Sequence, residues 1–341
     1  MTSDDVRAAF ADAVDVFDGP LFRSWCVAVA QETGRDDGTL TAFESRGLRF
    51  TSWKAVQSLL RATSMELRRA GEDLQLVDYF PVLGGQLPAD DRAFQLWREL
   101  LRDRRGHLVR HLDGPVRPLN DPINGVRILS LLDDYLDETY AEPLTLELLC
   151  VGAAAGLELV ADALTADVLP PEVVSTGGLR AAGDLPLLGR HSIVHRGGVD
   201  LEPLDPRDSA TLDAMLSLLE PEEVDRQTRI RRAARLAQQQ DIVVSKRDAF
   251  AAVAAPGFGF GRLPVVFGSS FLCSVPEPTR MDELMRARYA EGIWISDEAA
   301  GVMRRVIDDP ELADVSPMTR VTRLVHYRAG EAIAIRTRVD G

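Results

Sequence analysis

The spacing of apolar residues predicts helices throughout the first part of the chain. In residues 51–70, apolar side chains from Trp53 to Leu67 recur at intervals of three and four, which places them on one helical stripe. Runs with the same period predict further helices at residues 6–16, 21–30, 91–112 and 124–140. No alternating pattern of comparable strength precedes residue 144. We therefore expect a helical N-terminal domain over residues 1–140.

After a boundary near residues 135–143, short apolar runs alternate with helical segments. The runs that predict strands lie at residues 144–151, 192–199, 241–245, 263–268 and 292–296, and those that predict helices at 157–166, 208–219, 222–239 and 277–290. This alternation is typical of a parallel sheet with helices on both faces. Residues 319–327 and 331–339 flank an Arg-Ala-Gly turn, which predicts a hairpin, so that the sheet ends antiparallel. We expect an α/β domain over residues 141–341.

The charge and composition of the chain argue against several classes of binding partner. The formal net charge of -14 disfavours non-specific binding to nucleic acid or to an anionic membrane. The three cysteines are too widely spaced for a disulfide framework or a zinc site, and we expect no bound metal. The first residues are acidic rather than those of a secretory signal, and no apolar run is long enough to span a membrane. These features predict a cytoplasmic protein with a small-molecule substrate; a homodimer is left open.

A small-residue loop follows the first predicted strand and precedes a predicted helix. Gly152, Ala154 and Gly156 permit a sharp turn and a close approach of a ligand to the backbone. A helix that starts here offers free N–H groups and the positive end of its dipole. The same loop is also compatible with packing alone, and the two interpretations carry about equal weight.

Two acids follow later strands of the predicted sheet. Asp200 follows the second strand, where a carboxylate accepts hydrogen bonds from ribose hydroxyls, and Asp248 follows the third, within reach of an adenine edge. The predicted cofactor contacts also include Leu201, Ala249 and Ser269. All lie at carboxyl ends of strands, where open α/β sheets bind ligands.

Two cofactors compete for such a crevice. A nicotinamide dehydrogenase usually has its dinucleotide loop near the start of its domain and a six-stranded parallel sheet. The terminal hairpin favours a methyltransferase, in which the seventh strand inserts antiparallel. The loop also departs from G-x-G-x-x-G, because Ala154 fills the middle position.

Five stretches together resemble one protein family, the bacterial domain of unknown function 2332. They are residues 79–85 (YFPVLGG), 146–159 (LELLCVGAAAGLEL), 198–205 (GVDLEPLD), 265–272 (VVFGSSFL) and 293–298 (IWISDE). The resemblance implies a class I methyltransferase-like, Rossmann-like mixed sheet with an antiparallel C-terminal hairpin, preceded by a helical domain, and S-adenosylmethionine as cofactor.

Three positions depart from the pattern of that family. Members usually carry an acid where Cys150 stands, which in related methyltransferases holds the cofactor's amino group; an Asn is usual at Glu158, and a His is frequent at Gly268. Strand alternation does not place Glu147 or Glu158 in the position of Cys150.

Several polar residues are candidates for catalysis or cofactor binding, and each also has a purely structural interpretation. Tyr79 is a candidate lid residue over the acceptor pocket, or a packing residue. Arg127 is a candidate for the cofactor carboxylate, or a solvated residue beside a helix cap. His195 is a candidate general base, although a mid-strand histidine is more often structural. Asp297 and Glu298 either face the crevice or cap the next helix.

Other polar patterns favour ordinary surfaces. His107 and His111 share a helical face, for which we expect solvation rather than a metal. The arginine-rich residues 226–235 predict a solvated helical face. The sequence around Ser269 and Ser270 lacks the elbow of a serine hydrolase.

Together these observations predict transfer of a methyl group, or another S-adenosylmethionine-dependent transfer, to a small molecule. The alternative is a degenerate methyltransferase fold that binds a ligand or scaffolds a partner.

Overall fold

The computed structural model describes residues 3–32, 38–44, 49–113, 118–164, 169, 187–255, 262–307 and 309–340. The chain forms two compact units, each described by itself below. The helical unit comprises Met1–Leu119 and Asp208–Gln227, and the sheet unit comprises Asn120–Arg207 and Thr228–Gly341. Within these described ranges, every helix is too short or too polar to cross a membrane.

The helical unit is built from short helices around one aromatic core. Its α-helices are α1 (Ser3–Ala13), α2 (Pro20–Gln31), α3 (Thr41–Glu44), α4 (Trp53–Ala70), α5 (Asp91–Asp103), α6 (Arg105–Asp113), α9 (Ser209–Leu216) and the first turn of α10 (Val224–Gln239). Short 3₁₀ turns, η1 (Gly71–Asp73), η2 (Gln75–Tyr79) and η3 (Pro81–Leu83), connect α4 to α5. The apolar stripes that predicted these helices all face inward.

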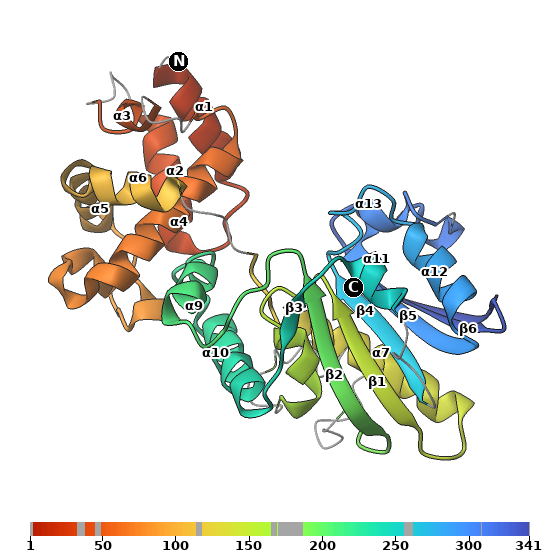
Figure 1. The fold of residues 1–341 in the computed structure, drawn as a ribbon. Coiled ribbons are helices and arrows are strands. Elements are labelled where there is room, and N and C mark those ends of the chain that lie inside the picture. Colours follow the sequence, from red (N-terminus) through yellow and green to blue (C-terminus); the bar gives the residue numbers. More distant parts are fainter. Residues whose placement is uncertain are drawn as a thin grey trace. The chain divides into compact units, whose positions relative to one another are not determined.

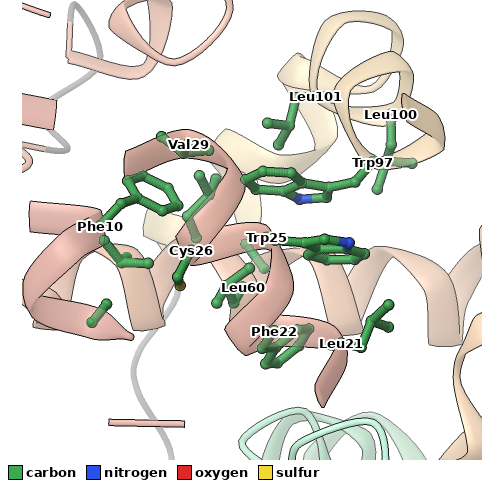
Figure 2. Packing of buried hydrophobic residues seen from close by; sticks show 14 of the residues in the cluster. Phe10, Leu21, Phe22, Trp25, Cys26, Val29, Leu60, Trp97, Leu100 and Leu101 are labelled. Carbon is green, nitrogen blue, oxygen red and sulfur yellow. The ribbon is translucent and has the colours of Figure 1, made fainter. Parts of the chain in front are cut away.

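The core of this unit is centred on two tryptophans (Figure 2). The rings of Trp25 and Trp97 stack with centroids 4.9 Å apart and planes 10° apart, and both side chains are fully buried. Phe10 and Phe22 pack around this pair. The Trp97 indole N–H donates to the Thr63 hydroxyl at 3.2 Å, so its polar atom is satisfied inside the core.

Residues 208–227 belong to the helical unit although they lie between two strands in sequence. The Glu222 carboxylate accepts the N–H of Leu21 at 2.9 Å, and the Glu220 carboxylate accepts that of Gly19 at 2.6 Å. These bonds satisfy backbone donors at the start of α2, which the chain itself leaves without a side-chain cap. Periodicity carries no record of such long-range capping, so sequence analysis did not detect this insertion.

The sheet unit contains a seven-stranded mixed sheet in the order β3-β2-β1-β4-β5-β6-β7 (Figure 1). The strands are β1 (Thr145–Val151), β2 (Ser192–Asp200), β3 (Val244–Lys246), β4 (Leu263–Ser269), β5 (Glu291–Ala299), β6 (Arg320–Arg328) and β7 (Glu331–Val339). The first five are parallel, whereas β5–β6 and β6–β7 pair antiparallel. The predicted hairpin and antiparallel ending are therefore confirmed. The expectation that a seventh strand inserts antiparallel, as in a methyltransferase, is however wrong, because β6 pairs with β5 and β7 lies at the edge of the sheet, paired with β6.

Helices cover both faces of this sheet. On one face lies α7 (Ile123–Thr139), which bonds to β6 and β7 through pairs such as Tyr135 with His326 and Asp134 with Arg338. The other face carries α11 (Ala249–Val253), α12 (Arg280–Arg288) and α13 (Ala300–Met303), packed on an apolar cluster. Arg229 of α10 forms a buried ion pair with Asp121, which lies just before α7.

Several predicted boundaries differ from the observed ones. The helix predicted at residues 91–112 is two helices, because the chain leaves the helical conformation at Arg104. The predicted strand at 241–245 is reduced to β3, since Asp241 has a φ of +50°. The predicted helix at 157–166 is instead the 3₁₀ helix η4 (Leu157–Ala163). Finally, α7 packs on the sheet and so belongs to the second unit, which begins at Asn120 rather than near residue 140.

Candidate functional site

The strand order reverses between β1 and β4, which sets a topological switch point. Successive strands run from β1 to β3 toward one edge and from β4 to β5 toward the other. Open α/β sheets bind ligands outside the carboxyl ends of the strands at such a point. Here the carboxyl ends carry Val151, Asp200, Lys246 and Ser269. The edge that they form is the candidate site, which we call the carboxyl edge.

The loop after β1 turns sharply through three residues with left-handed backbone. Gly152, Ala154 and Gly156 have φ values of +66°, +45° and +72°. A side chain at Gly156 would be strained by this φ and would meet Ile242 and Val244 at 3.0 Å. The small residues of this loop are therefore required by its own conformation and packing.

Most of the loop amides that we expected to be free are bonded within the protein. The N–H of Ala153 donates to the Val199 carbonyl at 3.1 Å, and the N–H of Leu157 donates to the Asn120 side-chain oxygen at 2.8 Å. Because η4 is a 3₁₀ helix of seven residues, it also lacks the N-terminal α-helical turn that was predicted. Amide donation by a helix N-terminus is thus not the way in which this loop would hold an anion.

Asp200 ties the end of β2 to this loop. One carboxylate oxygen accepts the N–H of Ala154 at 2.9 Å, and the other accepts the N–H of Glu202 at 2.8 Å. Each oxygen retains a further lone pair. The Asp200 side chain is half-buried, and the neighbouring Leu201 is 65% exposed. A carboxylate fixed in this way is preorganised to accept donors from a ligand that lies on the loop.

Asp248 lies one strand further along and acts as the N-cap of α11. Its Oδ1 accepts the N–H of Ala251 at 2.8 Å, while Ala249, the next residue, is buried. The backbone N–H of Arg247 donates to the Asp200 carbonyl at 2.9 Å, which joins the two acids through the backbone. Asp200 and Asp248 lie at the ends of adjacent strands, as predicted. Asp248 also has a structural role, because it caps α11.

A buried carboxyl, Glu158, lies against the end of β1. Its Oε2 is 3.9 Å from the Cys150 sulfur, and its Oε1 accepts the Ser269 hydroxyl and, at 3.4 Å, the Asn120 amide. The alternation of β1 gave no reason to expect this contact, because Glu158 comes from η4 beyond the loop. Sequence analysis considered Glu158 as an acid that compensates for Cys150 but found no support for it in strand alternation, because the contact depends on how the chain folds back after the loop.

Burial controls the ionisation of this cluster. Desolvation raises the pKa of Glu158 to about 7, and the nearby Asp297 carboxyl adds to the rise. Desolvation also raises the pKa of the Cys150 thiol well above its ordinary value, with the charge of Glu158 adding to it. Cys150 is therefore an inert thiol here, whereas Glu158 exchanges a proton near neutral pH.

Asp297 and Glu298 are both fully buried and point to opposite faces of β5. The Asp297 carboxylate pairs with Arg320 and accepts the Thr322 hydroxyl at 2.9 Å. Glu298 accepts the N–H of Leu272 at 2.6 Å. Burial raises the pKa of Asp297 and raises the pKa of Glu298 to about 7. Neither acid caps the following helix, whose N-cap is Ala299, and both carboxylates bond within the protein, so the alternative that they face the crevice stays a prediction.

Arg127 is engaged by its own unit. Its Nε is 2.7 Å from the Asp340 carboxylate, and its Nη1 donates to Asn124 at 3.0 Å. Asn124 in turn donates to the Ser269 hydroxyl at 3.2 Å. Arg127 thus borders the Glu158 cluster, but a ligand carboxylate would have to displace Asp340 to bind it.

The two candidate catalytic residues belong to different units, His195 to the sheet unit and Tyr79 to the helical unit. His195 is exposed in the first half of β2, opposite Glu147, five residues before Asp200. At about 3.3 Å per residue this is on the order of 16 Å from the strand end. His195 therefore does not lie at the carboxyl edge, and the prediction that it acts there as a base is corrected. Tyr79 is buried in the helical unit and its hydroxyl donates to Asp90 at 3.4 Å. Its predicted role as a lid stays a prediction.

Two predicted solvated surfaces contain buried contacts. His107 and His111 do share a face of α6, but both approach the buried Glu66 carboxylate, at 3.2 and 3.1 Å. Among the arginines at 226–235, Arg229 is buried. The predicted solvated face is therefore wrong for His111 and Arg229, because periodicity does not reveal the buried acids, Glu66 and Asp121, on other segments.

Asp133, Asp137 and His191 form a cluster whose ligand atoms lie within 4.8 Å of one another. The Nδ1 of His191 accepts the N–H of Leu144 at 3.1 Å, so the neutral ring carries its proton on Nε2, 3.7 Å from Asp137. A metal would need a lone pair on that nitrogen. The arrangement therefore favours a histidine–carboxylate pair that fastens α7 to the start of β1.

The close approach of α7 and η4 sets the position of Glu158, and it depends on Gly125. A Cβ at Gly125 would lie 2.6 Å from the Glu158 carbonyl oxygen and 2.9 Å from the Ala161 Cβ. We expect Gly125→Ala to lower the free energy of unfolding by roughly 1 to 3 kcal/mol, because overpacking outweighs the better helix propensity of alanine. Urea unfolding measures this.

Gly106 in α6 is the matched control for that substitution. Nothing lies within 4 Å of a Cβ there. Gly106→Ala should therefore leave stability unchanged or raise it by up to about 1 kcal/mol. Equal effects of the two substitutions would contradict the close packing of α7 on η4.

One family model matches the chain over residues 5–333 and describes an uncharacterized protein conserved in bacteria, DUF2332. No match was found among curated proteins.

Proposed function

Because the chain belongs to the DUF2332 family of uncharacterized bacterial proteins, membership supplies no reaction, and we propose from the site that the protein is an S-adenosylmethionine-dependent transferase. Its simplest reaction is transfer of a methyl group to a small molecule. The observation that carries the proposal is the fixed carboxylate of Asp200 against the Ala154 amide at the switch point. This arrangement supports the proposal, because open α/β sheets bind ribose hydroxyls through a carboxylate at a strand end beside such a loop.

The Glu158 carboxyl supports the choice of cofactor. The family resemblance implies an acid at position 150, where this chain has a cysteine. A carboxyl oxygen of Glu158 lies 3.9 Å from the Cys150 sulfur, so the acid is supplied from η4 instead of from β1. An ammonium group bound there would favour the ionised form of Glu158, because an opposite charge offsets the cost of burial.

Asp248 and Arg127 are not equally able to contact a nucleoside cofactor. The second carboxylate oxygen of Asp248 is available for an adenine edge, whereas Arg127 is already paired with Asp340. We therefore assign Asp200 to the ribose, Asp248 to the adenine and Glu158 to the amino group, and we leave Arg127 as a positioning residue for Asn124 and Ser269. When bound, the cofactor supplies an activated methyl group, and the protein orients the acceptor toward it.

Calorimetry with S-adenosylmethionine and S-adenosylhomocysteine tests the proposal. Asp200→Ala should weaken the binding of both about tenfold or more, because a charge-assisted hydrogen bond to the ribose is lost. Glu202→Ala is the control, since Glu202 is an exposed neighbour that contacts Asp200 only through its backbone N–H. Equal affinities for wild type and Asp200→Ala would refute the ribose assignment.

A second candidate is a degenerate fold that scaffolds a partner or binds another ligand. The internal bonding of the Ala153 and Leu157 amides favours it, because these donors are then not offered to a cofactor. If neither S-adenosylmethionine nor S-adenosylhomocysteine binds at millimolar concentration, this second candidate takes precedence.

A further inference from the structure

A pocket of about 240 Å³ opens in the sheet unit on the face opposite α7. Its walls come from α12, from α13 and the turn that follows it, and from β5, β6 and β7 (Figure 1). These strands lie on the other side of β1 from Asp200 on β2. The pocket is therefore separate from the ribose and adenine positions proposed above.

The walls of this pocket are mainly apolar. Trp294, Met303 and Val325 line it, and all three residues are nearly fully buried. Ile335 on the edge strand also lines it and is 46% exposed, which places it at the opening. Such a surface binds the apolar part of a ligand, since burial of apolar area is favourable.

One of the two cations in the pocket is already neutralised. The Asp282 carboxylate accepts the Tyr327 hydroxyl at 2.5 Å on one oxygen and the Arg286 Nε at 2.6 Å on the other. Arg286 also lies over the Tyr327 ring at 5.3 Å. These three side chains form a closed group with no charge left for a ligand.

Arg323 is the second cation, and it is incompletely satisfied. Its side chain is 14% exposed, and among the described residues its hydrogen bonding consists of one long contact, from Nη1 to Asp309 at 3.5 Å. A guanidinium has five N–H donors. None of its nitrogens is among the buried atoms that lack a partner, so the remaining donors reach open space, and Arg323 lines the pocket. Burial lowers the pKa of Arg323, which reflects the cost of its poor solvation.

We propose that this pocket binds a small aromatic carboxylic acid, with the carboxylate on Arg323 and the ring against Trp294, Met303 and Val325. A guanidinium binds a carboxylate in a bidentate manner, which suits the unused donors of Arg323. A cavity of about 150 Å³ holds a benzene molecule, and drug-sized ligands take about 300 Å³ or more. The ligand is therefore one ring with a short acid side chain.

The first test uses the wild-type full chain. Benzoate, phenylacetate and 3-phenylpropionate are titrated by calorimetry, each beside its uncharged primary amide. We expect at least one acid to bind at millimolar concentration or tighter, and its amide to bind roughly tenfold more weakly. If no acid binds more tightly than its amide, the proposal is wrong.

Two variants locate the binding site. Arg323→Gln should reduce the affinity for the acid to that of the amide, and Ala332→Phe should abolish binding of both, because Ala332 lines the pocket and the added ring fills it. Arg336→Gln, on the same hairpin but paired with Glu138 of α7, should bind as wild type does. Wild-type affinity in both Arg323→Gln and Ala332→Phe would overturn the assignment. Neither residue contacts Asp200 or Glu158, so this result is independent of cofactor binding.

Discussion

Replacement of Arg229 by methionine should lower the free energy of unfolding by about 3 to 5 kcal/mol. Arg229 on α10 pairs with Asp121 through two bonds, from Nε to Oδ1 at 3.0 Å and from Nη2 to Oδ2 at 3.2 Å. The two side chains are 6% and 5% exposed. Removal of the guanidinium takes this counter-charge away from a buried carboxylate, which is the costly case for an internal ion pair.

Two further variants separate the effect of the lost charge from the effect of lost packing. The double variant Arg229→Met with Asp121→Asn should recover most of the loss, because an amide at 121 needs no counter-charge and still accepts the N–H of Ile123. Arg235→Met, on the same helix but exposed, should change stability by less than about 0.5 kcal/mol. Urea unfolding followed by circular dichroism measures all three. A small effect of Arg229→Met would show that the pair is open to water.

This ion pair also bears on the candidate site. Asp121 follows Asn120, whose side-chain oxygen accepts the Leu157 amide and whose nitrogen donates to Glu158. The link from α10 therefore passes through two adjacent residues to the loop after β1. Arg229→Met should disturb the candidate site as well as stability, whereas Arg235→Met should disturb neither.

The order of elements could be predicted from the sequence because it depends on local periodicity. Five parallel strands, the helices between them and the terminal hairpin all leave a record in runs of apolar residues. The acids at strand ends, Asp200 and Asp248, could be predicted for the same reason, since a strand end is a local feature.

What could not be predicted depends on contacts between distant segments. Arg229 looks like one of several arginines on a solvated face until Asp121, more than a hundred residues away, is placed beside it. His195 looks like a site residue until the register of β2 shows how far it lies from the strand end. Glu158 lies beside Cys150 in a segment on which α7 packs closely at Gly125. None of these relations has a signature in spacing.

Replacement of Glu158 by glutamine should change the pH dependence of stability strongly. Burial raises the pKa of Glu158 from 4.5 to about 7, so the folded state binds a proton more tightly than the unfolded chain. The stability that this proton contributes is complete below the unfolded pKa and is lost as the pH rises toward 7. The advantage of Glu158→Gln over wild type should therefore grow by about 2 to 3 kcal/mol between about pH 5 and about pH 8.

The control for this experiment is Glu142→Gln, which removes an exposed carboxyl from the same unit. An exposed carboxyl is hydrated in both states, so this variant should follow the wild-type curve at every pH. If the Glu158→Gln and wild-type curves run parallel, Glu158 is ionised in the folded protein and must be paired with a cation. If the curves diverge as expected and S-adenosylmethionine brings them together again, a bound positive charge restores the ionised form of Glu158, because it offsets the cost of burial. If Asp200→Ala is added to both proteins, S-adenosylmethionine should no longer bring the two curves together, since Asp200 and Glu158 are assigned to the same bound molecule.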